Sequence, residues 1–121
     1  MSFALTTPQV LARKKTVTRR VGWAFLKPGD LIQAIEKGQG LKKGEHVRKL
    51  AVLRVTSVDR EFITEICEEA NESYGCAEVV AEGFPDLSPE EFVTMFIKTH
   101  PAAAHQRVTR IEFEYLDGEI A

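Results

Sequence analysis

Arg13-Lys14-Lys15-Thr16-Val17-Thr18-Arg19-Arg20 is the stretch of this sequence that says most about its fold and its chemistry. Five cationic side chains and two hydroxyls lie within these eight residues. Because β-branched residues favour an extended backbone, the centre of the stretch predicts a short strand. Alternate side chains of a strand share a face, which would place Thr16, Thr18 and Arg20 together. Such a face can bind an anion or a polar base, whereas a solvated basic edge strand is the plain structural alternative.

Length and composition predict one globular, soluble domain over residues 1–121. The apolar content of 44% is ordinary. The chain has no apolar run near the roughly 20 residues needed to cross a bilayer, and it starts without a secretory signal pattern. We therefore expect a cytoplasmic protein with no membrane partner. In that compartment a structural disulfide between Cys67 and Cys76 is not expected.

Charge is distributed unevenly along the chain. Residues 1–60 hold 13 Lys and Arg against 4 Asp and Glu, a net charge of +9. Residues 61–121 hold 3 against 14, a net charge of -11, and together the halves give the -2 of the whole chain. A basic half can provide an electrostatic footprint for nucleic acid, although the two halves could simply attract each other.

Local patterns outline the order of the expected elements. A Thr-Pro pair at residues 7–8 predicts a helix start, and Ser88-Pro89-Glu90-Glu91 predicts a strongly capped one. Lys27-Pro28-Gly29-Asp30 predicts a turn. Strands are expected at residues 2–5, 16–20, 31–35, 50–58 and 108–115, a basic loop at 37–49, and helical pieces at 7–14, 62–69, 76–82 and 89–100. This order predicts an α+β fold, a small mixed β-barrel with helices packed on its outside.

The order of these motifs resembles the ASCH domain family of the PUA-like superfamily. The resemblance rests on Lys15-Thr16-Val17-Thr18-Arg19-Arg20, the Lys-Pro-Gly-Asp turn, Glu82-Gly83-Phe84, the Ser-led helix and the closing Arg-Ile-Glu-Phe strand. It covers nearly the whole chain. It implies a PUA-like pseudobarrel with a cleft lined by the Lys-Thr-Val-Thr-Arg segment, and a module that binds RNA or a modified nucleotide there.

One branch of this family implies an enzyme. Small bacterial ASCH proteins similar to this chain hydrolyse the acetyl amide of N4-acetylcytidine with a lysine base, a threonine nucleophile and a glutamate acid. On this resemblance Lys15, Thr18 and Glu82 are the candidate catalytic residues. Each has a plain structural alternative, because Lys15 and Glu82 could form an ordinary ion pair and Thr18 could be an ordinary strand residue. Another ASCH member resembles a ribonuclease, so the fold alone does not fix the chemistry.

The remaining candidates concern ligand binding. The candidate ligand-binding residues are the cationic and hydroxyl side chains of the motif and one aromatic ring that could stack on a base. They are Lys14, Thr16, Arg19, Arg20 and Trp23. His100 with His105, and Cys67 with Cys76, lack a standard zinc spacing, so neither a metal nor a cofactor is expected. Two classes therefore stay open: a module that binds RNA or a nucleotide in a basic cleft, and an amidohydrolase of acylated cytidine, with a ribonuclease as the lesser variant.

Overall fold

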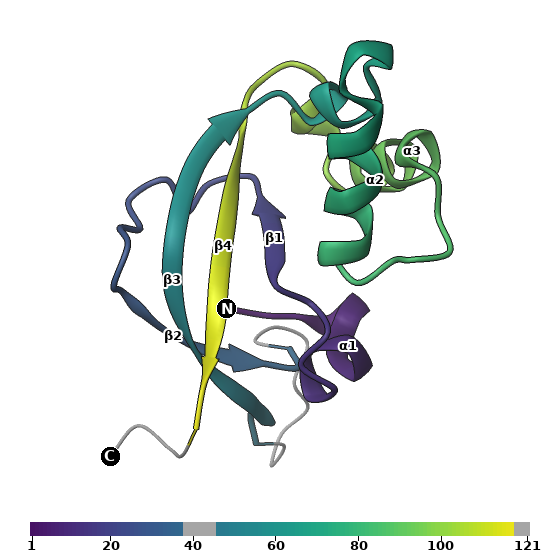
Figure 1. Cartoon of the computed structure of the whole chain (residues 1–121). Helices are drawn as coiled ribbons and strands as arrows, with labels where there is room; N and C mark the ends of the chain where they lie inside the picture. Colours follow the sequence, from purple (N-terminus) through teal and green to yellow (C-terminus); the bar gives the residue numbers. More distant parts are fainter. Residues whose placement is uncertain (38–45, 118–121) are drawn as a thin grey trace.

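The computed structural model describes residues 1–37 and 46–117, and Figure 1 shows a twisted sheet with helices gathered beside one of its edges. The sheet has four strands, β1 (Val17–Arg20), β2 (Leu31–Ile35), β3 (Lys49–Glu61) and β4 (Val108–Leu116). The α-helices of the described residues are α1 (Thr7–Leu11), α2 (Glu72–Ala81) and α3 (Pro89–Thr99). Short 3₁₀ helices are η1 (Ala4–Thr6), η2 (Ile63–Cys67), η3 (Glu69–Asn71) and η4 (Pro101–Ala104). The predicted α+β class is confirmed.

The sheet is antiparallel, in the order β1-β4-β3-β2. Its long central pair runs from Val52 opposite Leu116 to Glu61 opposite Val108, with a register shift between Val55 and Ser57. Such a bulge bends a strand and increases its twist. The strands predicted at residues 31–35 and 108–115 are found with nearly the same bounds, and β3 extends the strand predicted at residues 50–58 at both ends.

The predicted barrel closure is wrong, since β1 and β2 lie at opposite edges of an open sheet within the described residues. Closure requires every strand to have a partner on both sides. Beside β1 that place is taken by the end of α2, where the backbone N–H of Thr16 donates to the carbonyl of Ala81 at 2.8 Å. The strand expected at residues 2–5 is reduced to one parallel bridge between Ser2 and Ile35, followed by η1.

The helices follow their predicted signals in part. Ser88 caps α3 as predicted: its hydroxyl accepts from the N–H of Glu91 at 3.1 Å, and the Glu91 carboxylate accepts from the N–H of Ser88 at 2.9 Å. Pro8 stands in the first turn of α1, but Thr7 is not its cap and donates instead to the carbonyl of Phe3. The basic loop predicted at residues 37–49 falls largely on 38–45, which lie outside the described residues.

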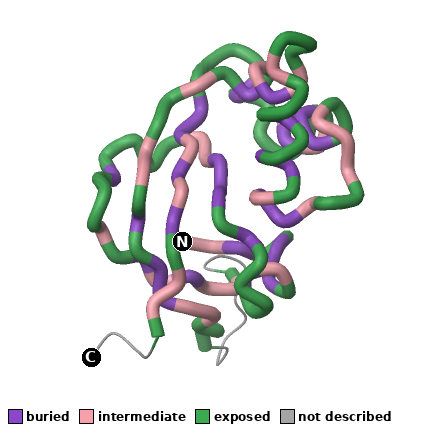
Figure 2. Tube along the Cα trace, viewed as in Figure 1, coloured by how far each residue is buried: buried purple, intermediate pink, exposed green. Residues whose placement is uncertain are grey.

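Buried residues, purple in Figure 2, include two apolar clusters, one on the sheet and one among the helices. Phe3, Val10, Leu53 and Phe113 belong to the sheet cluster, which also holds Leu26, Ile32, Ala34, Val55 and Ile111. The helical cluster holds Ile63, Ile66, Val79, Phe92, Val93, Phe96, Ala103 and Val108. Among the described residues, no helix is long and apolar enough to span a bilayer.

Candidate functional site

A cavity of about 230 Å³ lies where η1, β1, the end of α2 and α3 meet. Its lining includes Phe3 of the sheet cluster and Phe92 and Phe96 of the helical cluster, so both apolar clusters border it. The polar part of the lining is formed by Lys15, Thr18, Arg19, Arg20 and Glu82. The remainder consists of Ser2, Ala4, Leu5, Thr6, Phe84, Met95, Thr99 and His100.

Lys15 is held at the start of β1 by contacts with three other segments. Its backbone N–H donates to the carbonyl of Gln9 in α1 at 3.3 Å, and its carbonyl accepts from the Tyr115 hydroxyl of β4 at 2.6 Å. The residue is only 2% exposed. Its Nζ donates both to Oε1 and to the backbone carbonyl of Glu82, each at 2.7 Å. The lysine expected to act as a base therefore faces the glutamate expected to act as the acid.

Glu82 reaches this position because α2 ends there. Glu82 is the C-cap of α2, and Gly83 follows it with φ of +100°, a conformation that glycine adopts without a side-chain penalty. A Cβ on Gly83 would lie 3.0 Å from Cγ of Gln9, so the site also requires a close approach of the backbone. Gln9 Nε2 donates to the carbonyl of Gly83 at 3.0 Å, which fixes α1 against this turn.

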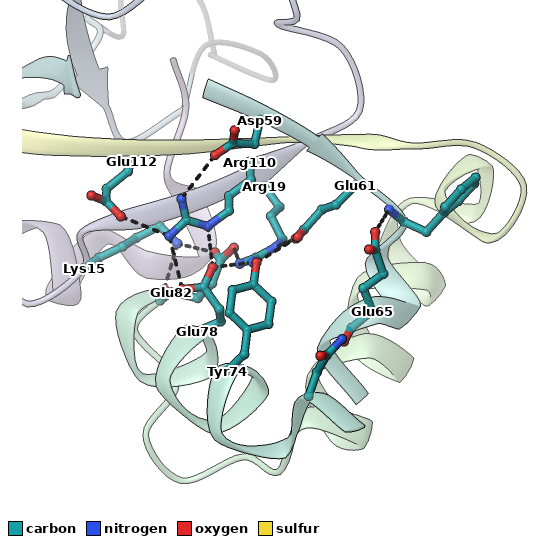
Figure 3. A network of polar contacts seen from close by, with 12 residues as sticks. Lys15, Arg19, Asp59, Glu61, Glu65, Tyr74, Glu78, Glu82, Arg110 and Glu112 are labelled. Atoms are coloured by element: carbon teal, nitrogen blue, oxygen red, sulfur yellow. Dashed lines mark hydrogen bonds and ion pairs between the residues drawn. The ribbon is translucent and has the colours of Figure 1, made fainter. Parts of the chain in front are cut away.

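Arg19 is the centre of a buried ionic network (Figure 3). Its Nε donates to Oε1 of Glu61 at 2.6 Å and its Nη1 to Oε2 of Glu82 at 3.0 Å. Its Nη2 is bonded to Oε1 of Glu78 and to the Tyr74 hydroxyl. Arg110 of β4 approaches Glu78 from the other side. Arg19 therefore has its charge compensated by carboxylates and holds Glu82 in place.

Arg20 and Thr18 lie together on the cavity side of β1, as strand alternation predicts. Arg20 Nε donates to Oγ1 of Thr18 at 3.2 Å. The guanidinium carbon of Arg20 lies 4.7 Å from the centre of the Phe3 ring, a cation–π distance. The Thr18 hydroxyl accepts this bond, which leaves its own proton available to a base in the cavity.

The electrostatics of the site favour a neutral lysine more than ordinary surroundings do. Burial lowers the pKa of Lys15 below its ordinary value of 10.5, and the charges of Arg20 and Arg19 lower it further. The carboxylate of Glu82 acts in the opposite direction but does not cancel these effects. The net result is a lysine that loses its proton more readily than a solvated one.

The structure brings together some of the predicted site residues and not others. Lys15, Thr18, Arg19, Arg20 and Glu82 all line the cavity. The other three predicted ligand-binding residues do not line it: Lys14 and Thr16 are exposed, and Trp23 is 36% exposed and packs on Phe25 with ring centres 5.5 Å apart. The catalytic and binding roles of the residues that do line it stay predictions.

Several residues of the site were absent from the sequence prediction. Glu78 in α2 and Glu82 at its C-cap stand four residues apart, so their helical spacing was a signal that could have paired them. Glu61 at the end of β3 and Arg110 in β4 carried no such local signal, because only the sheet brings them to Arg19. Among the described residues, no group of three His, Cys, Asp or Glu side chains could hold a metal ion.

Comparison with known proteins gives a fold and no family. No family model matches the sequence, and no curated protein matches it. The chain is similar to the crystal structure of hypothetical protein PH0355, with a TM-score of 0.59, 20% identity and 94% of each chain covered. It is also similar to protein EF3133 from Enterococcus faecalis V583, of family model DUF984, with a TM-score of 0.57 and 19% identity over 97% of this chain and 75% of that one. At these identities the likeness concerns the fold alone.

Proposed function

We propose that this chain is an ASCH-type amidohydrolase whose cavity binds a nucleoside-sized ligand and removes an acyl group from its amide nitrogen. The observation that carries the proposal is the 2.7 Å contact between Nζ of Lys15 and Oε1 of Glu82 beside Thr18 in one cavity. The order of the motifs in the sequence supports the ASCH assignment. We place the activity in the cytoplasm, where the free thiols of Cys67 and Cys76 would stay reduced.

The Lys15–Glu82 contact can supply both a base and an acid. If the shared proton moves from Nζ to the carboxylate, the ion pair becomes a neutral amine and a carboxylic acid without any exchange with solvent. Desolvation favours this neutral form, since burial penalises charged groups. Arg19 opposes it, because its bond to Oε2 of Glu82 stabilises the carboxylate. The neutral form is therefore reached during the reaction and need not be the resting state.

The proposed reaction has two halves. In the first, Lys15 takes the proton of the Thr18 hydroxyl, the Thr18 oxygen bonds to the acyl carbon, and the carbon–nitrogen bond breaks as Glu82 gives its proton to the leaving amine. In the second, water attacks the acyl-threonine ester and gives a proton to Glu82. The protonated Lys15 returns its proton to the Thr18 oxygen, the carboxylic acid leaves, and all three residues are restored.

The rest of the lining supports a base-like ligand. Phe3, Phe84, Phe92 and Phe96 line the cavity, and bases of any kind stack on aromatic rings. Arg20 already covers one face of Phe3, and His100 stacks on Phe96. The volume of about 230 Å³ lies below the roughly 300–1,000 Å³ of pockets for drug-sized ligands. A single nucleoside fits this scale better than a segment of RNA does.

The test is hydrolysis of N4-acetylcytidine, followed by the release of cytidine. We expect Thr18→Val, Lys15→Met and Glu82→Gln each to lower kcat at least about 100-fold, the scale of a lost acid, base or nucleophile. Matched controls are Thr16→Val and Lys14→Met, which alter exposed neighbours outside the cavity and should keep the activity. The proposal is overturned if the wild-type protein releases no cytidine above background, or if Thr18→Val remains as active as Thr16→Val.

The pH profile tests the base separately. The reactive state needs the one proton that Lys15 and Glu82 hold between them, so kcat should fall as pH rises through the pKa of Lys15 in the folded protein, where the pair loses that proton. Because burial and the neighbouring arginines lower that pKa, the midpoint should fall below 10.5. A rate that is constant across pH 7–10.5 and unaffected by Lys15→Met would exclude lysine as the base.

RNA binding is the second candidate, and exposed cations favour it. Arg13, Lys14, Arg48 and Lys49 are all exposed, and each could contact a phosphate. This candidate predicts that binding to a single-stranded RNA weakens steeply with salt and that Lys14→Ala weakens it further. Binding that does not change with salt would exclude phosphate contacts as its source.

A further inference from the structure

Two adjacent arginines of β1 have opposite surroundings. Arg19 meets three carboxylates, those of Glu61, Glu78 and Glu82. Arg20 has no ion pair with any carboxylate of residues 1–37 and 46–117, and its hydrogen-bond partner is the neutral hydroxyl of Thr18. A guanidinium left without a counter-ion in a partly buried position is unusual, because burying a charge is costly unless it is paired.

A count of charges shows that Arg20 is in excess. Inside the network the cations Lys15, Arg19 and Arg110 face the carboxylates of Glu61, Glu78 and Glu82, so these six groups are balanced. Arg110 also meets Glu112 and Asp59, but these two lie at the solvent edge with side chains 46% and 65% exposed. None of these carboxylates forms an ion pair with Arg20, which leaves one positive charge at the cavity wall.

The orientation of Arg20 is fixed in a way that suits an anion. One face of its guanidinium lies 4.7 Å from the Phe3 ring centre, and its Nε is used by Thr18. The two Nη nitrogens have no partner among the described residues. Among the described residues, the side-chain polar atom that is both fully buried and without a partner is Oε1 of Gln9. The Nη nitrogens of Arg20 are therefore not fully buried. The free Nη1–Nη2 edge can therefore make the paired hydrogen bonds that arginine makes to phosphate or carboxylate.

We propose that Arg20 forms an anion subsite of the cavity, which binds a phosphate or carboxylate group carried by the ligand. Resting on the function proposed above, this assigns the substrate as an acylated nucleotide with a 5′-phosphate instead of a neutral nucleoside. Burial lowers the pKa of Arg20 to about 10 against the opposing charge of Glu82, as expected for a guanidinium that lacks a close counter-ion. A bound anion would supply that counter-ion.

Calorimetric binding tests the subsite without any need for turnover. Cytidine 5′-monophosphate, cytidine, inorganic phosphate and acetate are titrated into the wild-type protein, Arg20→Gln and Arg54→Gln. Arg54 forms an exposed pair with Glu114 on β3 and serves as the charge-matched control. We expect the monophosphate to bind the wild-type protein and Arg54→Gln at least about tenfold more tightly than cytidine does, and Arg20→Gln to lose that preference. Phosphate binding without acetate binding would identify the anion as phosphate. Acetate binding without phosphate binding would identify a carboxylate and overturn the assignment of a 5′-phosphate.

Equal affinities of cytidine and its monophosphate for the wild-type protein, with no binding of phosphate or acetate, would overturn the subsite. A stability measurement checks that Arg20→Gln reports on binding. Since Arg20 has no carboxylate to leave unpaired, this variant should unfold at the same or a higher urea concentration than the wild-type protein. If Arg20→Gln nevertheless fails to fold, Arg20→Lys serves: it keeps the charge, lacks the paired donors, and should lose part of the preference. A preference fully kept in Arg20→Lys would contradict the bidentate contact.

Turnover separates this inference from the proposed function. N4-acetylcytidine and its 5′-monophosphate are compared as substrates. If neither is hydrolysed while cytidine 5′-monophosphate still binds through Arg20, the amidohydrolase proposal fails and the anion subsite stands. If both are hydrolysed with equal kcat/KM, the amidohydrolase proposal stands and the anion subsite fails. Both proposals stand if the monophosphate has the higher kcat/KM and Arg20→Gln removes the difference through KM.

Discussion

Replacement of Glu82 by Gln is the sharpest perturbation of the site, because Gln keeps the shape of Glu and removes its charge. Oε1 of Glu82 accepts from Lys15 at 2.7 Å and Oε2 from Arg19 at 3.0 Å, in a residue that is 3% exposed. An amide can offer its oxygen to one of these cations, but its NH₂ group then faces the other. Two buried cations would lose their shared counter-ion.

The expected loss of unfolding free energy in Glu82→Gln follows from that geometry. Removing one partner of a buried ion pair costs about 3–5 kcal/mol, since the remaining charge is left uncompensated. This is a large part of the roughly 5–15 kcal/mol that stabilises a typical domain. Lys15 can escape part of the cost by losing its proton, so we expect a loss near 3 kcal/mol, at the lower end of that range. Arg19 keeps Glu61 and Glu78 as partners.

The assay is urea unfolding followed by far-ultraviolet circular dichroism, with Glu114→Gln as the matched control. Glu114 pairs with Arg54 at 3.2 Å with both side chains about half exposed, so its loss should cost no more than about 1 kcal/mol. The double variant Lys15→Met/Glu82→Gln should be more stable than Glu82→Gln alone, because no unpaired lysine is left in it. A Glu82→Gln protein within about 0.5 kcal/mol of wild type would refute the reasoning, since that is the scale of an ordinary surface substitution.

Three further predictions concern stability. Gly83→Ala should lower the unfolding free energy more than Gly29→Ala does. Both positions have positive φ, but an added Cβ would meet Gln9 at Gly83 and nothing at Gly29. Thermal unfolding should therefore show the larger fall in Tm for Gly83→Ala. Burial raises the pKa of Glu78, but bonds from Arg110 and the charge of Arg19 outweigh it and lower the pKa below 4.5. The stabilisation from Glu78 is therefore complete above pH 4.5 and is lost as pH falls through its lowered pKa. Urea unfolding across pH 2–6 should show that the unfolding free energy depends less on pH in Glu78→Gln than in the wild-type protein. Ser88→Ala should cost about 1 kcal/mol of unfolding free energy and leave ligand binding unchanged, whereas an unchanged urea midpoint would contradict the capping role.

Local sequence signals predicted much of the secondary structure, because their causes are local. The Ser88-Pro89-Glu90-Glu91 signal predicted α3 through hydrogen bonds that close within four residues. Alternation of apolar and polar residues predicted β4, in which Thr109, Ile111 and Phe113 share one face and are buried. The strand expected at residues 2–5 failed because four residues with one edge contact do not form a ladder, and the chain turns into η1 instead.

The closure of the sheet could not be read from local patterns. Whether β1 meets another strand or the end of α2 depends on which group takes the N–H of Thr16, and Ala81, sixty-five positions away, provides it. The roles of Arg19 and Arg20 were likewise indistinguishable in the sequence, where both are arginines of one basic run. Only the packing of α2 and β3 around β1 gives Arg19 three carboxylates and leaves Arg20 without one.

The sequence by itself determined the alternation in the Lys15–Arg20 segment and the types of chemical group available there: an amine, a hydroxyl and two guanidiniums, with Glu82 marked at a distance by its motif. It did so because strand geometry and side-chain chemistry depend on neighbouring residues. The tertiary structure decided that Lys15 and Glu82, sixty-seven positions apart, meet in one buried ion pair, and that Arg19 is paired with carboxylates while Arg20 is not. Those outcomes depend on burial and on which charges meet, and both are properties of the assembled fold.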